Sequence, residues 1–403
     1  MFRIATASTV LEDPKRAVDA LVDALKRQEL LSPTYLMVHL NAAYDGERVM
    51  AQLQARLPST QLHVSTSCMG AMSDAGPAIA ASAGMAAFGL SDSAGRYGTG
   101  FADYGGRGAG AAAEAALDQA LLAAGMEGEM PNLVWISGSP GQEEAAIAAL
   151  EDVLGPSVPI IGGSSADNDL SGLWYQGTQQ GLSTPDHPGV VISVLAPSVP
   201  VGTAFLSGHA PTEKQAVVTK CQDRTILELD GKPARQVYQD WVDPNLADLA
   251  ADRDAFVLNR TTLSPLGRRI GAIQGANVYL LSHPESLTAE GGITLFTDIQ
   301  PNETVTLMEG SIEALVQRAA RVTDASIRLN ELDGDRISGA IIVYCAGCML
   351  TVQDRMRDVC SGIGEILADR PFIGTFTYGE QGRVLGEANR HGNLMISAVV
   401  FGG

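Results

Sequence analysis

Three stretches of the chain share one order of apolar and polar positions: an apolar run, an amphipathic segment and a second apolar run. The first apolar runs lie at residues 35–40, 133–137 and 341–344. Short uninterrupted apolar runs are typical of strands buried on both faces, whereas the segments between them have the period of a helix. Because parallel strands need helical connections, each stretch predicts a strand, a crossover helix and a parallel strand.

A further apolar run closes each stretch, at residues 84–90, 189–196 and 393–401. The repetition predicts an α/β protein with mixed β-sheets and flanking helices, built from repeated β-α-β-β units. A chain of 403 residues exceeds the usual size of one core, so we expect two domains. Ligands of such folds bind beyond the carboxyl ends of the strands, and we expect the loops of the three units to converge there.

Capping residues predict where several helices begin. Asp13 is a favourable N-cap, and it precedes Pro14, which suits the first helical position. Asp45 stands before the helix of the first stretch, and Ser311 stands before an amphipathic segment at residues 312–329. We therefore expect helices to start at these three caps.

A hairpin predicted at residues 217–231 turns at Gln222 and Asp223, and we place the domain boundary there. The first domain then spans residues 1–222 and the second spans residues 223–403. Residues 254–300 are rich in strand-forming residues but irregular, so we expect them to interrupt the third unit.

Composition narrows the classes of partner. The formal net charge is -19 and no run is rich in lysine or arginine, so neither nucleic acid nor an anionic membrane surface is an expected partner. No uninterrupted apolar stretch reaches about 18 residues, so membrane insertion is not expected. Five cysteines without the spacing of a disulfide scaffold favour free thiols, and the predicted location is cytoplasmic.

Three cysteines follow predicted strands. Cys345 and Cys348 form a CxxC motif between a strand and a helix, and Cys68 occupies the corresponding loop of the first unit. A thiol at a helix N-terminus is stabilised as thiolate, so we expect Cys348 to begin the helix and to be the most reactive thiol. The open roles are a redox couple, nucleophilic or acid–base catalysis, and small buried side chains in tight loops. No metal site is expected, because a second CxxC or an HxxxH is missing.

A predicted loop at residues 375–382 places Tyr378 and Glu380 after a buried strand, and Arg390 and His391 follow before the last strand. Arginine and glutamate beside glycine N–H groups can hold the carboxylate and the ammonium of an amino acid. A solvated turn with surface ion pairs is the alternative.

Several phrases of the sequence resemble FIST proteins. PIIGGSSAD, VGTAFLSGHAP, VVTK followed by ELDGKPARQVY, YCAGC and PFIGTFTYGEQG occur here in the order found in that family. The resemblance extends over nearly the whole chain and implies a FIST N-type domain at residues 1–222 and a FIST C-type domain at residues 223–403. FIST proteins are bacterial sensory proteins, so the resemblance implies a small-molecule ligand and a signalling partner such as a histidine kinase.

One branch of the family, the NosP-like proteins, binds haem and reports nitric oxide. No cofactor is otherwise expected, and the resemblance makes haem the alternative, with His209 in a loop after a strand as its preferred ligand. His39 is expected in the core, whereas His63, His187 and His283 are expected at the surface.

The predicted function is sensing of an amino acid or a related small polar metabolite in the cleft between the repeat loops. The alternatives are a haem-based nitric oxide sensor and a cysteine-dependent enzyme that uses Cys68, Cys345 and Cys348, although we expect binding rather than catalysis. The residues predicted to contact the ligand are Ser67, Cys68, Gly162, Gly163, Ser164, Asp167, Cys345, Tyr378, Glu380, Arg390 and His391.

Overall fold

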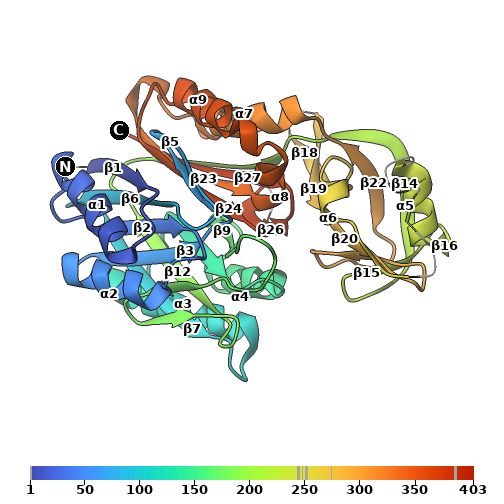
Figure 1. Cartoon of the computed structure of the whole chain (residues 1–403), viewed down its shortest axis with the longest axis horizontal. Coiled ribbons are helices and arrows are strands. Elements are labelled where there is room, and N and C mark those ends of the chain that lie inside the picture. Colours follow the sequence, from blue (N-terminus) through green and yellow to red (C-terminus); the bar gives the residue numbers. More distant parts are fainter. Residues whose placement is uncertain (1, 243–245, 247, 250–252, 274, 385–387) are drawn as a thin grey trace.

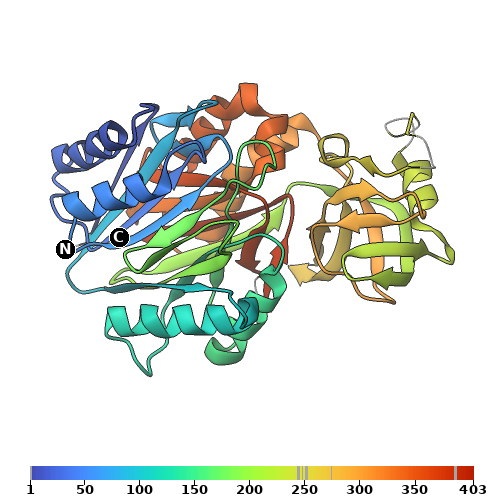
Figure 2. The same ribbon diagram turned by 60° about the horizontal axis from the view of Figure 1, so that its bottom comes forward.

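The chain forms a large α/β body and a smaller β-rich lobe that projects from one end of it (Figure 1, Figure 2). This architecture confirms the predicted fold class. Among the described residues, no helix is both long enough and apolar enough to cross a membrane. The computed structural model describes residues 2–242, 246, 248–249, 253–273, 275–384 and 388–403.

The body consists of three units with one order of elements: strand, helix, strand, helix, strand, hairpin and strand. The first unit contains β1 (Phe2–Thr9), α1 (Pro14–Arg27), β2 (Tyr35–Leu40), α2 (Gly46–Arg56), β3 (Gln61–Thr66), β4 (Gly70–Ser73), β5 (Gly76–Ile79) and β6 (Met85–Asp92). The second contains β7 (Arg96–Asp103), α3 (Gly108–Ala124), β8 (Leu133–Gly138), α4 (Glu143–Leu154), β9 (Ile160–Ser164), β10 (Gln176–Thr178), β11 (Gly181–Ser183) and β12 (Gly189–Ala196).

The third unit has the same order, with the lobe inserted after its first strand. It contains β13 (Val201–Ser207), α7 (Ile312–Leu329), β23 (Ile337–Cys345), α8 (Ala346–Thr351), α9 (Met356–Ile366), β24 (Phe372–Thr377), β25 (Glu380–Arg383), β26 (Asn389–Gly392) and β27 (Met395–Gly402). Two 3-10 turns, Gly334–Arg336 and Gln353–Arg355, connect these elements. The capping predictions are confirmed, because the side chains of Asp13, Asp45 and Ser311 each accept a hydrogen bond from the first turn of their helix.

Four strands of each unit lie together in one six-stranded sheet, and a hairpin from another unit completes that sheet. The strands joined by a crossover helix pair in parallel in every unit, β2 with β3, β8 with β9 and β23 with β24, as the sequence predicted. The hairpins are exchanged: β4 pairs with β24, β10 pairs with β3, and β25 pairs with β9. The exchange links the three units into a closed ring.

Helices cover the outside of this ring, with α1 beside α2, α3 beside α4 and α7 beside α9 (Figure 1). The inner faces of the three sheets meet in a common apolar core that includes Tyr35, Phe88, Trp135, Ile341 and Phe401. Burial of apolar surface against all three sheets holds the units together.

Small residues set the spacing between α3 and the sheet below it. A Cβ atom at Gly98 would lie 2.0 Å from the carbonyl oxygen of Ala120, and a Cβ at Gly100 would lie 2.0 Å from that of Ala116. Only glycine in β7 therefore permits the alanine-rich helix to approach so closely.

The lobe extends from β14 to β22, so the interruption of the third unit is larger than the predicted 254–300. Its strands form one nine-stranded sheet around a separate apolar core. The predicted boundary at residues 222 and 223 falls at the turn between its first two strands. The lobe contains β14 (Ala210–Gln222), β15 (Thr225–Leu229), β16 (Lys232–Pro233), α5 (Ala234–Val242), β17 (Ala255–Phe256), α6 (Leu258–Thr261), β18 (Leu266–Ile273), β19 (Ala276–Ser282), β20 (Pro284–Leu287), β21 (Ile293–Leu295) and β22 (Thr304–Glu309).

Candidate functional site

A cavity of about 470 Å³, here called the central cavity, lies between the body and the lobe. The turns after β3 and β24, the loop after β9 and the start of α8 form its body side, and lobe residues close the other side. Of the residues predicted to contact a ligand, Cys68, Cys345 and Tyr378 line it. The full lining is Cys68, Pro140, Gly141, Glu143, Asn168, Asp169, Leu170, Arg224, Leu258, Asn259, His283, Phe296, Cys345, Ala346, Gly347, Leu350, Thr377, Tyr378 and Asn393.

Two buried polar atoms in this lining have no hydrogen-bond partner among the described residues, Asn393 Nδ2 and His283 Nε2. Asn393 is 2% exposed and His283 is 3% exposed. The carboxamide oxygen of Asn393 accepts a hydrogen bond from the His283 backbone N–H at 3.2 Å, so the two residues hold each other in place. Buried polar atoms are rarely left unpaired, and these two are therefore available to a ligand.

His283 was expected at the surface, and this prediction is wrong. A histidine before a proline resembles a turn, but Pro284 begins β20 and the histidine packs at the junction with the body. Burial, together with the nearby His209, lowers the pKa of His283 to about 3, so its imidazole is neutral. His63, also expected at the surface, is fully buried and contacts the hydroxyls of Ser193 and Ser137.

The cysteines of the CxxC motif differ in position. Cys345 is the N-cap of α8 and lines the central cavity, whereas Cys348 lies in the first helical turn and is fully buried. The expectation that Cys348 begins the helix is therefore wrong, and Cys345 is the thiol that faces the cavity. Cys68 lines the same cavity from another unit, and burial, with Asp167 and Cys345, raises its pKa to about 12.

A buried arginine lies behind the CxxC thiols. Arg318 of α7 is 1% exposed, donates a hydrogen bond from Nη1 to the Leu394 carbonyl at 2.8 Å, and lies 5.1 Å from the Tyr344 ring centre. Burial disfavours a thiolate at Cys348, but the hydrogen bond with Cys345 and the charge of Arg318 outweigh it and lower its pKa. Burial and Cys348 raise the pKa of Cys345, so the cavity-facing thiol stays protonated.

Glu380 is fully buried at the start of β25 rather than in the predicted loop, and it does not line the central cavity. Its carboxyl group accepts hydrogen bonds from the Met395 backbone N–H and the Thr377 hydroxyl, both at 2.9 Å. Burial and the adjacent Cys345 raise the pKa of Glu380 well above its usual value. These hydrogen bonds fix the Glu380 side chain in the protein interior behind the lining of the central cavity.

Asp167 and Tyr378 hold the loop after β9 in position. The Asp167 carboxylate accepts hydrogen bonds from the backbone N–H groups of Leu170 at 2.7 Å, Gly172 at 2.5 Å and Leu173 at 2.8 Å. The Tyr378 hydroxyl donates to the same carboxylate, and the burial of the ring together with this bond raises the pKa of Tyr378. Asp167 therefore shapes the cavity without lining it.

Gly162 and Gly163, two of the predicted contact residues, lie within strand β9 (Ile160–Ser164). A Cβ atom at Gly162 would lie 1.9 Å from the Ile136 carbonyl oxygen, and one at Gly163 would lie 2.3 Å from Thr377 Cγ2. Close strand packing thus accounts for both glycines.

Two predicted contact serines are also bound to the protein itself. The Ser164 hydroxyl donates to Glu143 Oε1 at 2.7 Å, and the Ser67 hydroxyl accepts from the Phe376 backbone N–H at 2.8 Å. Both serines are fully buried and lie outside the lining of the central cavity. They fix the strand ends on which the cavity is built.

Arg224, at the tip of the first hairpin of the lobe, joins the lobe to the body. Its guanidinium contacts Glu143 at 3.0 Å and Glu144 at 2.6 Å, both at the start of α4, and Asp298 of the lobe at 2.9 Å. Burial disfavours ionisation of Glu143, but the neighbouring His391, Arg224 and two hydrogen bonds lower its pKa below the usual value. We call these three carboxylates and Arg224 the Arg224 cluster.

Two family models together match most of the chain. The model of the FIST N domain matches residues 34–232, and the model of the FIST C domain matches residues 234–383. This chain belongs to the FIST family. FIST domains are associated with small-ligand binding in sensory signalling, and the resemblance inferred from the sequence is confirmed.

Other similarities to the FIST chain are weaker. Uncharacterized protein MJ1623 of Methanocaldococcus jannaschii is 36% identical over 89 residues, which are 22% of this chain and 17% of that protein. A cyanuric acid hydrolase from A. caulinodans is 14% identical with a TM-score of 0.29, over 51% of this chain and 71% of that chain. A second cyanuric acid hydrolase, described as an evolutionary innovation by structural concatenation, is 11% identical with a TM-score of 0.36 over both whole chains.

The surroundings of His209 in this FIST chain do not fit a haem ligand. Its Nε2 lies 2.9 Å from the Thr262 carbonyl oxygen, and its ring packs closely against Gly310. Burial and the charge of Arg318 lower the pKa of His209 to about 3. His209 does not line the central cavity, whereas His283 does.

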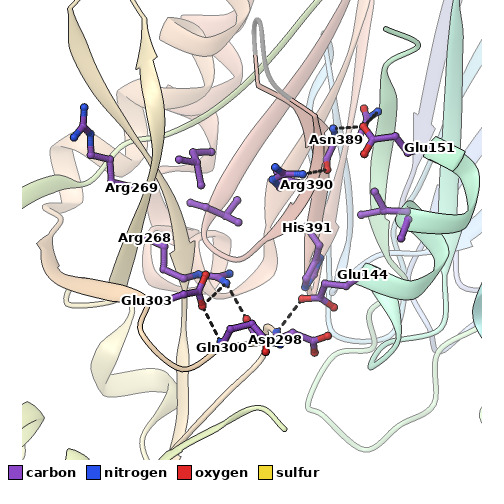
Figure 3. A pocket seen from close by; sticks show the side chains of 14 residues that line it. Glu144, Glu151, Arg268, Arg269, Asp298, Gln300, Glu303, Asn389, Arg390 and His391 are labelled. Carbon is purple, nitrogen blue, oxygen red and sulfur yellow. Dashed lines mark hydrogen bonds and ion pairs between the residues drawn. The ribbon is translucent and has the colours of Figure 1, made fainter. Parts of the chain in front are cut away.

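Arg390 and His391 lie in a second cavity of about 360 Å³ in the FIST chain, here called the lateral cavity (Figure 3). The Arg224 cluster separates it from the central cavity, because Glu143 and Arg224 line one and Glu144 and Asp298 line the other. Five of the predicted contact residues thus lie in two different cavities, and the other six line neither. His391, Glu143 and Glu144 place potential ligand atoms within 4.8 Å of one another, but Arg224 already bridges the two carboxylates.

Proposed function

We propose that this FIST chain is a cytoplasmic sensory protein that binds an amino acid or a related small polar metabolite in the central cavity. The observation that carries the proposal is the pair of buried, unpartnered polar atoms in the cavity lining, Asn393 Nδ2 and His283 Nε2. An apolar cavity with a few convergent polar groups is the usual form of a small-molecule site.

The lining supports a ligand of this class. Asn393 offers a donor to a carboxylate or carbonyl oxygen, and the exposed side chain of Asp169 offers an acceptor to an ammonium group. Leu258, Phe296 and Leu350 provide apolar surface for the remainder of the molecule. Binding would therefore combine a few oriented hydrogen bonds with burial of a short apolar side chain.

The position of the cavity supports a sensory role. Cys68, Cys345 and Tyr378 belong to the body, whereas His283 and Phe296 belong to the lobe, so a ligand contacts both. A ligand that binds one arrangement of body and lobe more tightly shifts the population toward that arrangement. A histidine kinase or another signalling protein that recognises this arrangement would receive the signal.

Thermal unfolding in the presence of individual amino acids and related metabolites tests the proposal. A ligand at a hundredfold excess over its Kd stabilises the folded protein by about 2.7 kcal/mol. In Asn393→Asp the oxygen that accepts from His283 is kept and the unpaired donor is removed, so the stabilisation should disappear. Asn302→Asp makes the same change at an exposed turn and should respond as the wild type does. Equal stabilisation of all three proteins would overturn the proposal.

A cysteine-dependent enzyme is the second candidate, and one observation favours it. Cys345 faces the cavity that His283 also lines, and Arg318 lies behind the thiol pair. A thiol and an imidazole that line one cavity are the groups that nucleophilic cysteine catalysis uses, and proton transfer between them would need a bound substrate that raises the pKa of His283 and lowers that of Cys345. Turnover of the bound ligand that is lost in Cys345→Ser, with binding retained, would select this candidate.

The haem-based nitric oxide sensor is the remaining alternative, and it would need an axial ligand other than His209. His283 is the imidazole that lines the central cavity. A Soret band in freshly purified protein that disappears in His283→Ala would favour this alternative over the amino acid sensor.

A further inference from the structure

We infer that the lateral cavity is a second ligand site, separate from the proposed sensory site, and that it takes a small organic carboxylate with an apolar body. The cavity opens between α4 and β26 of the body and β18, β19 and the 298–303 segment of the lobe. Its lining includes three arginines, of which Arg269 points away from Arg268 and Arg390, and a patch of aliphatic side chains (Figure 3).

The two guanidinium groups approach the cavity from opposite sides. Arg390 extends from β26 toward the lobe, and Arg268 extends from β18 toward the body (Figure 3). Among the described residues, Arg390 forms no ion pair, and its Nη1 donates only to the carbonyl oxygen of Asn389 at 3.2 Å. Arg268 Nη1 donates to the Asp298 carbonyl oxygen at 2.9 Å and forms an ion pair with Glu303 at 3.5 Å, while its Nε is buried without a hydrogen-bond partner. Both arginines therefore retain donors for an anionic ligand.

The carboxylates around the cavity are already bound within the protein. Glu144 and Asp298 accept from Arg224 at 2.6 and 2.9 Å. Glu151 accepts from the backbone N–H of Asn389 at 2.9 Å, and Glu303 accepts from the backbone N–H of Gln300 at 2.9 Å. The donors in excess belong to the arginines, so the complementary ligand supplies acceptors. A carboxylate matches a guanidinium with two parallel hydrogen bonds.

An apolar patch completes the cavity. Ile147 and Ala148 of α4 face Ile270 and Leu280 of the lobe across it. Inorganic phosphate has no apolar part to cover this surface, whereas a short aliphatic or aromatic acid has one. The lining thus favours an organic monocarboxylate over a fully hydrated anion.

Ligand-observed NMR titration tests this inference with benzoate and hexanoate as probes and with benzamide and hexanamide as their uncharged counterparts. The carboxylates should bind the wild type, and Arg390→Gln should weaken them by about tenfold or more, because a charge-assisted hydrogen bond is lost. The amides should bind the wild type no more tightly than the carboxylates bind Arg390→Gln.

Three further proteins make the result specific. Arg16→Gln changes the same charge on the exposed face of α1 and should bind the carboxylates as the wild type does. Asn393→Asp alters the central cavity and should also leave this binding unchanged. Ala148→Phe fills the lateral cavity from an exposed position and should abolish it. The inference would be overturned if the carboxylates did not bind the wild type. It would also be overturned if they bound Arg390→Gln with the same affinity as the wild type, or if the amides bound the wild type as tightly as the carboxylates do.

Discussion

Replacing Arg224 with glutamine should lower the free energy of unfolding by more than the loss of a single surface ion pair does, because it weakens the junction of body and lobe. Arg224 contacts three carboxylates within 3.0 Å, and Glu143 keeps only 6% of its side chain exposed. Removing one partner of a buried ion pair costs about 3–5 kcal/mol, because the other charge stays buried without compensation. The side chain of Arg224 is 20% exposed and that of Asp298 is 55% exposed, so solvent screening reduces the expected loss to about 2–3 kcal/mol.

The pH dependence gives the prediction a second readout. The folded-state pKa of Glu143 lies below its usual value of 4.5. The contribution of the ionised carboxylate to the free energy of unfolding is therefore complete above pH 4.5, and it is lost as the pH falls through the folded-state pKa. Without Arg224 the folded-state pKa of Glu143 rises toward the usual value. The stability difference between wild type and Arg224→Gln should therefore be largest near neutral pH and should shrink below pH 4.5.

Urea unfolding at several pH values measures this difference, and hydrogen exchange of β15 and β21 shows whether the lobe loosens first. Arg96→Gln is the matched control, because Arg96 pairs with Glu129 where both side chains are at least 40% exposed. This control should lose little stability. The reasoning is refuted if both variants lose the same amount, or if the difference does not depend on pH below 4.5.

Three other substitutions or modifications test parts of the site. Gly347→Ala should raise the free energy of unfolding, measured by thermal unfolding, by about 0.5 kcal/mol, because alanine favours the helix. Its methyl group would lie 3.8 Å from the nearest atoms of Cys345 and His283, which is an ordinary contact distance. A loss of stability would contradict the packing described. Glu380→Gln should gain stability relative to the wild type as the pH rises above 4.5, because the raised pKa of Glu380 makes ionisation of the folded wild type unfavourable. Iodoacetamide followed by peptide mass spectrometry should modify the half-buried Cys221 before Cys345 and should leave Cys348 unmodified. A bound ligand should protect Cys345, and early modification of Cys348 would contradict its burial.

The repeated units could be predicted from the sequence because each strand carries its own signal. Uninterrupted apolar runs identified β2, β8 and β23, and the caps Asp13, Asp45 and Ser311 located helix starts. These signals are local, since burial of a strand and satisfaction of helical N–H groups depend on neighbouring residues. The exchanged hairpins could not be predicted, because strands of three or four residues have no period that indicates a partner.

The site could be predicted only in part for the same reason. Cys68 follows a strand of the first unit, whereas Cys345 ends one strand of the third unit and Tyr378 follows another, and the topology brings them to one cavity. Arg224 and His283 belong to the inserted lobe, and their contacts with the body depend on how the lobe docks. A histidine before a proline and an arginine in a hairpin turn carry no local mark of burial, so sequence reasoning missed both.

A crystal structure of the protein with the ligand found by thermal unfolding tests the central claim most directly. The account predicts electron density for the ligand in the central cavity, with an acceptor atom within hydrogen-bond distance of Asn393 Nδ2 and a polar atom near His283 Nε2. A ligand bound elsewhere on the molecule, with Asn393 and His283 still unpartnered, would contradict it.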